Sequence, residues 1–277
     1  MVLNRLIGTL VLWMIAVPVF CQSVIDGKIY DRRSNKPLAN ASVSVNKKKV
    51  GSLSDKKGYF SLSSAGLKKT DTLILSSVGY ATLKIPLADA FEVKEYFLLE
   101  DSKELENVVL KSYSRYNAEG SSSEVTGYFT SWTTRMNGGE IGRIIHIRSK
   151  DFKVEKVRFK VNSQCDTCVI RLHIRALSNG LPGPDLLRDS TTIEIHKNSF
   201  DDKPLEFDFA DKNLIIKNNE YVFLGLETIY CHSANNGSCS LAYIGTEPGT
   251  YLYRTRDYRD WEESVMNSLY LKIFYTY

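Results

Sequence analysis

The chain has 277 residues, of which 43% are hydrophobic and 25% are charged, which suits one large or two ordinary globular domains. Its formal net charge of +4 is too small to indicate a nucleic-acid-binding protein. The lysines of "NKKKV", Asn46 to Val50, have no interleaved aromatic residues, and we interpret this segment as a solvated hairpin tip.

Residues 1–21 have the composition of a signal peptide. Arg5 is followed by an apolar run that ends at Val17 and is short for a membrane span. Because Val19 and Cys21 are small enough for positions −3 and −1 of a cleavage site, we expect an exported chain that begins at Gln22. A lipidated Cys21 is the alternative, although the three residues before it make a poor lipobox. No segment of the mature chain is apolar enough to span a bilayer.

From Val24 onward, apolar and polar residues alternate with a period of two, and strong helical periodicity is missing. The segments "SVSV" and "YFSLS" alternate cleanly, and "TLILSSVGYATLKI" predicts two strands that bend at Val78 and Gly79. Turn residues recur at short intervals between such segments. The pattern predicts a sandwich of short β-strands.

The stretch "SLSDKKGYFSL" contains Asp55, which is a metal ligand, a catalytic carboxylate or only a residue of a turn. An Asp that opens a turn accepts hydrogen bonds from backbone amides, and Gly58 suits a left-handed backbone conformation. A calcium loop needs alternating oxygen ligands, whereas lysines occupy the neighbouring positions here. We therefore expect Asp55 and Gly58 to be structural turn residues.

This hairpin lies within a segment that resembles the carboxypeptidase regulatory-like domain, from Ser23 to Glu100. The resemblance rests on the "PL.gA.V.V" strand, the "T-D-x-x-G-x-F" hairpin with Ser54 in place of Thr, and the "L-x-x-S-x-x-G-Y" strand pair; the matching residues are Pro37, Leu38, Ala41, Val43, Val45, Ser54, Asp55, Gly58, Phe60, Leu73, Ser76, Gly79 and Tyr80. It implies a seven-stranded, transthyretin-like sandwich that serves as an accessory module without catalytic residues. We assign this domain to residues 22–112.

The following "LENVVLKSY" is similar to the segment after this domain in TonB-dependent outer-membrane receptors, but no receptor barrel follows. Residues 113–127 have few aliphatic residues and a serine run, so we interpret them as a linker. Nine strand-like segments then follow within residues 128–277, from "YFTSWTT" to "LYLKIFYTY". They predict a second β-sandwich of jelly-roll type, which loosely resembles C-terminal domains that accompany the regulatory-like module in bacterial proteins.

The mature chain has four cysteines, Cys165, Cys168, Cys231 and Cys239, and an even number in an exported protein favours disulfides. If Asp166 and the next residue form a two-residue turn, Cys165 and Cys168 face each other across a ladder, about 5.5 Å apart at Cα. We therefore expect two local bridges, Cys165–Cys168 and Cys231–Cys239. Cross-pairing between the two pairs, a zinc site and a redox motif are the alternatives.

The sequence shows no catalytic motif, no metal-ligand spacing among its four histidines and no cofactor-binding loop. Exposed aromatic rings can stack on sugars, so we take five aromatic residues as candidates for ligand binding, with core packing as the alternative for each tryptophan: Trp132, Tyr251, Tyr253, Tyr258 and Trp261.

Together these features favour a non-catalytic, exported envelope protein that binds a glycan or a partner protein. We expect it in the periplasm or at the outer membrane or cell surface of a Gram-negative bacterium. A structural component that docks to an outer-membrane complex through a sheet edge is the first alternative. A hydrolase with an unrecognised site in the second domain is the other.

Overall fold

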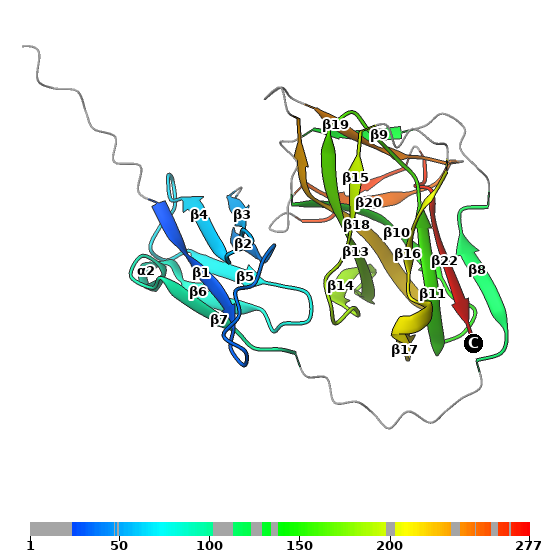
Figure 1. Ribbon diagram of the computed structural model, residues 1–277, viewed down its shortest axis with the longest axis horizontal. Coiled ribbons are helices and arrows are strands. Elements are labelled where there is room, and N and C mark those ends of the chain that lie inside the picture. The colour runs from blue at the N-terminus through cyan, green and yellow to red at the C-terminus, as the bar shows by residue number, and fades with distance from the viewer. Residues whose placement is uncertain are drawn as a thin grey trace, which may run out of the picture.

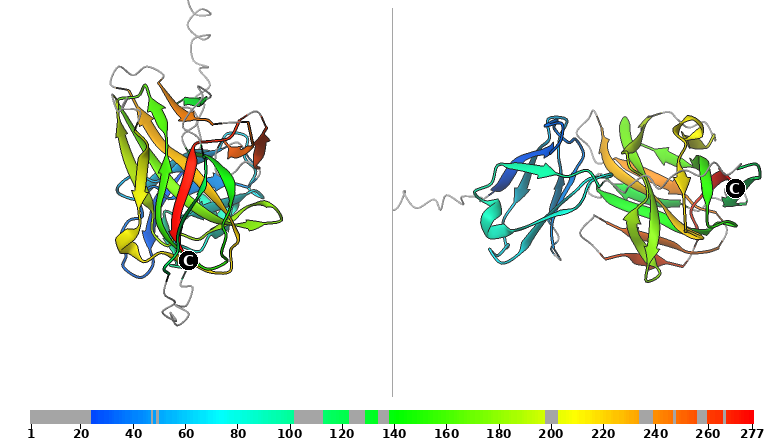
Figure 2. Two further views of the ribbon diagram at one scale, coloured as in Figure 1. Left: turned by 90° about the vertical axis from the view of Figure 1, so that its right-hand side faces the viewer. Right: turned by 90° about the horizontal axis from the view of Figure 1, so that it is seen from below.

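A computed structural model describes residues 24–46, 48, 50–101, 113–122, 129–133, 138–197, 203–233, 239–246, 248–255, 260–265 and 267–277. The predicted signal peptide and its cleavage site at Cys21 lie outside these residues, as do Lys47, Lys49 and the predicted domain boundary at residue 112. The described residues form two bodies of β-structure that lie side by side (Figures 1 and 2). No helix in this part of the chain combines the length and hydropathy that a membrane span requires.

The N-terminal body has seven strands and one short helix among the described residues: β1 (Val24–Asp31), β2 (Ser42–Val45), β3 (Gly51–Leu53), β4 (Tyr59–Ser63), β5 (Thr72–Ser76), β6 (Leu83–Pro86), α2 (Leu87–Ala90) and β7 (Glu95–Leu98). They form a three-stranded sheet, β4-β1-β7, and a four-stranded sheet, β3-β2-β5-β6. The alternating apolar residues of both sheets meet in one core, which contains Ile29, Val43, Phe60, Leu75 and Tyr96. The predicted seven-stranded sandwich is thus confirmed.

The C-terminal body has fifteen strands among the described residues: β8 (Tyr116–Gly120), β9 (Phe129–Thr133), β10 (Gly139–His146), β11 (Phe152–Phe159), β12 (Val161–Ser163), β13 (Thr167–Ser178), β14 (Leu181–Asp185), β15 (Thr191–His196), β16 (Leu205–Asp208), β17 (Ile215–Ile216), β18 (Tyr221–His232), β19 (Ser240–Ile244), β20 (Tyr251–Arg254), β21 (Glu262–Ser264) and β22 (Leu271–Thr276). A 3-10 turn, η2 (Ala210–Lys212), lies between β16 and β17.

Three sheets build this body. The largest has seven strands in the order β14-β13-β18-β10-β20-β21, with β15 also paired to β13. The second has the order β16-β11-β22-β8, with β17 also paired to β11, and the third has the order β12-β19-β9. One core cluster fills the body, with Ile145, Leu172 and Leu224 from the first sheet, Ile273 from the second and Leu241 from the third. The all-β class is confirmed, and each of the nine predicted segments contains a strand.

The predicted linker is wrong for Tyr116–Gly120, which forms β8 at the edge of the second sheet. Backbone pairing with β22 and a polar side-chain contact keep this segment in the sheet, so it does not need buried aliphatic residues. Its inward side chain is an amide, and Asn117 Nδ2 donates to the Tyr275 hydroxyl at 2.9 Å. Residues 123–127 of the predicted linker lie outside the described part of the chain.

Candidate functional site

The Asp55 turn takes its shape from one carboxylate. Asp55 Oδ1 accepts the backbone amides of Lys57 at 2.8 Å and Tyr59 at 2.9 Å. Gly58 has a φ of +75°, which L side chains rarely adopt, and a Cβ there would meet the carbonyl of Ile29. The contacts of Asp55 are those of a capping residue, as the sequence predicts for a structural turn.

The local disulfide scheme is wrong, and the cross-paired alternative is found. Cys165 bonds to Cys239 with Cα atoms 5.1 Å apart, and Cys168 bonds to Cys231 with Cα atoms 4.1 Å apart. Residue Asp166 does not make a hairpin, because Cys168 already belongs to β13, where it lies directly opposite Cys231 of β18. Cys168–Cys231 therefore joins neighbouring strands, and Cys165–Cys239 lies just beyond the paired ends of β12 and β19, a geometry that sequence spacing alone does not reveal.

The same cysteines account for the one potential metal site. Among the described residues, a single group of three or more potential ligands has donor atoms within 4.8 Å of one another, and it consists of Cys165, Cys168 and Cys231. All three sulfurs are in disulfides, so none is a thiolate that could bind zinc.

The aromatic candidates do not form one open surface. The ring of Trp132 is 4% exposed and packs edge-on against Tyr243, so core packing describes it. The Tyr253 hydroxyl donates to Glu262, and Tyr251 is 9% exposed. The half-buried Trp261 has the Arg254 guanidinium 4.6 Å above its ring, and Tyr258 lies outside the described residues.

A cluster of buried charges lies on the face of the seven-stranded sheet that is turned away from the core of its own body. We call it the charged cluster, and it consists of Glu140, Arg171, His173, Arg175, Asp185, Glu227 and Arg254. Strand alternation places these side chains opposite the core, since Leu172, Ile174 and Leu226 between them are core residues. Register aligns Arg254, Glu140, Glu227 and Arg171 across four adjacent strands.

Each carboxylate in this row has cationic partners. The carboxylate of Glu140 accepts hydrogen bonds from Arg175 Nε at 2.9 Å and Arg175 Nη2 at 3.0 Å. It accepts a third hydrogen bond from Arg254 Nη2 at 2.7 Å. Glu227 Oε2 accepts from Arg171 Nη1 at 3.2 Å and lies 2.9 Å from His173 Nε2. Paired and hydrogen-bonded charges of this kind are the form in which ionised groups are found inside proteins.

The protonation of His173 follows from its two neighbours. Nδ1 lies 2.5 Å from Asp185 Oδ2, and Nε2 lies 2.9 Å from Glu227. Burial opposes the charged imidazole, but Glu140 and Asp185 outweigh it and raise the pKa of His173 to about 9. Burial likewise opposes ionisation of Glu140, yet Arg175, His173 and Arg254 hold its pKa well below the usual range. His173 is therefore an imidazolium at neutral pH that donates to two carboxylates.

The glycine at position 225 makes room for the charged cluster. Gly142 and Gly225 lie opposite each other in β10 and β18, and His173 lies opposite Gly225 on the other side. A Cβ on Gly225 would collide with the carboxylate of Glu140. Glycine weakens a strand interior, so its use here is explained by the close approach of Glu140.

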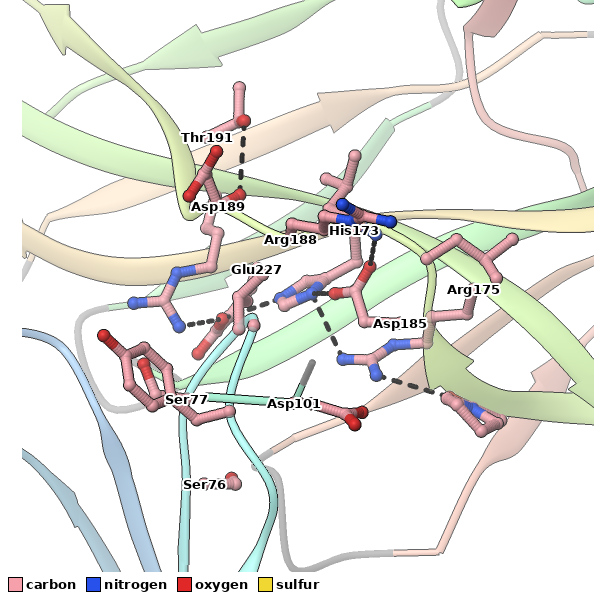
Figure 3. A pocket seen from close by; sticks show the side chains of 18 of the residues that line it. Ser76, Ser77, Asp101, His173, Arg175, Asp185, Arg188, Asp189, Thr191 and Glu227 are labelled. Atoms are coloured by element: carbon pink, nitrogen blue, oxygen red, sulfur yellow. Dashed lines mark hydrogen bonds and ion pairs between the residues drawn. The ribbon is translucent and has the colours of Figure 1, made fainter. Parts of the chain in front are cut away.

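The charged cluster forms one wall of a cleft of about 1360 Å³ between the two bodies (Figure 3). The other wall is the outer face of the β3-β2-β5-β6 sheet, which contributes Ser42, Ser44, Ile74 and Ser76. These residues alternate with the core residues of β2 and β5, so they point away from the N-terminal core. Figure 3 shows Ser76 and Ser77 on the side opposite His173 and Glu227.

Direct contacts join the two walls. Arg171 Nη2 donates to the carbonyl oxygen of Asn40 at 2.6 Å. Val78, in the loop between β5 and β6, is 9% exposed and belongs to the core cluster of the C-terminal body. A Cβ on Gly79 would collide with the carbonyl of Arg188, so the two bodies touch there. The loop therefore packs onto the C-terminal body at one end of the cleft.

The chemistry of this site is that of a polar receptor. Both ring nitrogens of His173 are occupied by carboxylates, so the imidazolium has no lone pair with which to activate a nucleophile. The serine hydroxyls and the paired charges can instead exchange hydrogen bonds with a bound molecule.

Sequence reasoning missed the charged cluster, although one signal was present. In "RLHIRAL", Arg171, His173 and Arg175 alternate with apolar residues in the middle of a 12-residue strand. A strand whose polar face is this densely charged is either exposed or paired with charges on neighbouring strands. The sheet order shows that these cations are paired with charges on neighbouring strands, because β18 lies next to β13 and β10 lies next to β18.

Comparison with known proteins supports the identity of the N-terminal body. Residues 25–110 match the family model of the CarboxypepD_reg-like domain. No curated protein matches the chain. The match contains all seven strands of the N-terminal sandwich and both of its sheets. The resemblance noted in the sequence is thus confirmed, and residues 25–110 form a CarboxypepD_reg-like domain with a β-sandwich fold.

Proposed function

We propose that the protein is an exported, non-catalytic binding protein that holds a neutral glycan in the cleft between its two bodies. The observation that carries the proposal is the composition of the cleft, whose walls come from both bodies. Serine hydroxyls line one wall and mutually paired charges line the other. Such walls offer many hydrogen bonds and little uncompensated charge.

The pairing of the charges favours a neutral ligand. The charged cluster contains four cations, one of which is the protonated His173, and three carboxylates. Its net charge is therefore small. A strongly charged ligand would have to compete for partners that are already bound in the protein. Sugar hydroxyls can donate to the carboxylates and accept from the guanidinium groups without separating them, and Ile74 and Val78 offer apolar surface to C–H groups.

The size of the cleft and the state of His173 support binding rather than turnover. Ligand sites in proteins are usually about 300–1,000 Å³, so a cleft of about 1360 Å³ has room for an oligosaccharide. A general base for hydrolysis needs an accessible lone pair, and His173 has none. The N-terminal body belongs to a family of regulatory, non-catalytic modules.

Export to the periplasm or the outer membrane of a Gram-negative bacterium is part of the proposal. The composition of residues 1–21 supports it, and the two disulfides suit an oxidising compartment. The intact mass of the exported protein should correspond to a chain that begins at Gln22. An acylated Cys21 would contradict secretion as a free protein and support lipid anchoring.

A glycan array with variants of the mature chain tests the cleft. Ser76→Trp places a large ring in the cleft, whereas Ser61→Trp places the same ring on exposed strand β4, outside the cleft. We expect the wild type and Ser61→Trp to bind the same neutral oligosaccharides and Ser76→Trp to lose them, with similar melting temperatures for all three. Equal binding by both variants, or no neutral glycan bound by the wild type, would contradict the proposal.

A second candidate function, docking to a partner protein, is favoured by the outer face of the β4-β1-β7 sheet. Tyr59, Phe97 and Leu99 there are 41%, 40% and 55% exposed, and Phe97 stacks on Tyr30 with ring centroids 5.6 Å apart. Clustered exposed apolar residues often mark interaction sites. Crosslinking in cells should give a defined adduct that Phe97→Asp abolishes and that Thr192→Asp, on exposed strand β15 of the C-terminal body, retains; the same adduct with both variants would exclude this face.

A further inference from the structure

The outer face of the second sheet of the C-terminal body carries an unusual set of side chains. Strand β11 contributes Lys156 and Arg158, β22 contributes Lys272 and Phe274, and β8 contributes Tyr116. Register places Lys156 opposite Phe274 and Arg158 opposite Lys272, so these side chains share one side of the sheet. We call this set the basic face. Strands β22 and β8 of this sheet lie on the side of the molecule away from the N-terminal body (Figure 1).

Three cations converge on one aromatic ring of the basic face. The Lys156 ammonium, the Arg158 guanidinium and the Lys272 ammonium lie 5.2, 4.7 and 5.6 Å from the centroid of Phe274. Phe274 itself is 9% exposed, because the stems of these side chains help to cover it. The ring therefore holds the three charges close together at the surface.

The charges of the basic face are only partly neutralised. Glu206 on β16 accepts from Lys156 at 3.2 Å and from Arg158 at 2.6 Å, and Asp208 lies opposite Lys156 in the ladder. Farther along the same face, Lys160 lies 5.4 Å from the centroid of the Tyr270 ring. Lys153 and Glu155 at the end of this face pair with each other at 3.4 Å. Five cations thus face three carboxylates, which leaves an excess of two positive charges on one side of the sheet.

Tyr116 adds an open aromatic surface to these charges. It is 60% exposed, and its ring centroid lies 6.2 Å from that of Phe274. An exposed flat ring suits the apolar C–H face of a sugar. Cations beside such a ring suit carboxylate or sulfate groups on the same sugar chain.

We propose that the basic face binds an acidic polysaccharide, with Tyr116 under a sugar ring and Lys156, Arg158 and Lys272 on its anionic groups. Alternate residues of a strand lie about 6.6 Å apart, so the cations form a row that suits a linear chain. A membrane surface fits less well, because Phe274 and Tyr270 are 9% and 5% exposed and have little apolar surface to insert. None of the residues of the basic face lines the cleft, and the proposal does not depend on the cleft.

Binding of the mature protein to heparin, polygalacturonate and neutral dextran tests the proposal. We expect both acidic polymers to bind at low salt, dextran to bind at least about tenfold more weakly, and added NaCl to weaken the acidic polymers. The double variant Lys156→Gln/Lys272→Gln and the variant Tyr116→Ala should each weaken binding about tenfold.

Two controls match these variants in chemistry but lie elsewhere. Lys28→Gln/Lys84→Gln removes two exposed strand lysines of the N-terminal body, and Tyr221→Ala removes a tyrosine that is 50% exposed on β18. Both should retain affinity within about twofold of the wild type. Equal losses in the controls and the basic-face variants would overturn the proposal, as would the absence of binding to both acidic polymers. Binding to phosphatidylglycerol vesicles that matches heparin binding would overturn it in favour of a membrane.

Discussion

At the scale of single residues, the Asp55 carboxylate replaces a hydrogen-bonding partner that the backbone of a tight hairpin cannot supply. It accepts two amides within the turn, while the carbonyl of Asp55 accepts the amide of Gly58 at 2.9 Å. The left-handed φ of Gly58 brings that amide into place. The contacts of Asp55 therefore fix the shape of the hairpin.

We predict that Asp55→Ala lowers the free energy of unfolding by about 1 kcal/mol, because two amides lose their acceptor. Gly58→Val should cost more, since it adds backbone strain and a contact with the carbonyl of Ile29. Denaturant titration checks both, with Asp55→Asn as the variant that keeps an acceptor oxygen. Unchanged stability in Asp55→Ala and Gly58→Val would show that the turn interpretation is wrong.

His173 gives stability a defined dependence on pH. Its pKa rises from 6.5 in the unfolded chain to about 9 in the folded protein, so folding favours proton binding between these values. The stabilisation from His173 is full below about pH 6.5 and is lost as the pH rises through about 9. Glu140 and Glu227 have lowered pKa values, so their contribution is present near neutral pH and lost in acid.

We therefore predict that the free energy of unfolding falls between pH 6.5 and pH 9, and that His173→Gln flattens this part of the profile. Urea titrations of both proteins across the range provide the measurement. Since His146 and His196 are exposed on the sheet surface, His146→Gln is the control and should leave the wild-type slope unchanged. A wild-type profile that is flat from pH 6.5 to 9 would contradict the imidazolium assignment.

At the scale of elements, Cys168–Cys231 joins β13 to β18, Cys165–Cys239 lies beside the paired strands β12 and β19, and the two disulfides close nested loops. The bonded cysteines are 74 and 63 residues apart in sequence. In the chain-entropy description, a loop of this length stabilises by about 4 kcal/mol. Once one bridge is present, the other closes a loop of only about 11 residues through it, so its own contribution falls to about 3 kcal/mol.

We predict that removing either bridge, as Cys168→Ser/Cys231→Ser or Cys165→Ser/Cys239→Ser, costs about 3 kcal/mol, and that removing both costs about 7 kcal/mol. Denaturant titrations of the three variants measure the difference. Peptide mapping without reduction should recover Cys165 linked to Cys239 and Cys168 linked to Cys231. A peptide that links Cys165 to Cys168 would contradict the strand register described above.

The elements also show where sequence patterns succeed and fail. Strands that bury one side, such as β4 with its sequence YFSLS, have the alternation that predicts them. Strand β14 does not, because Pro182 and Pro184 indicate a turn, yet an edge strand tolerates proline on its unpaired side. The cysteine pairing failed for a related reason, because it depends on which strands are neighbours, and alternation carries no information about sheet order.

At the scale of the whole molecule, the cleft depends on contacts between residues far apart in sequence. Arg171 reaches the carbonyl of Asn40 across 131 positions, and Val78 packs into the core of the other body. The sequence predicted two β-sandwiches but not the cleft, because each wall looks like an ordinary polar sheet face until the two are placed together. The charged cluster stands out as a candidate site only because the structure shows that its side chains are buried.

Amide chemical-shift mapping with a neutral oligosaccharide identified on the array tests the central claim most directly. The account predicts shifts at Ser42–Asn46 and Ser76–Thr82 in the N-terminal body and, at the same ligand concentration, at Arg171–Arg175 in the C-terminal body, with the oligosaccharide unchanged at the end of the titration. Shifts confined to one body, or conversion of the oligosaccharide into products, would contradict a non-catalytic glycan site formed between the two.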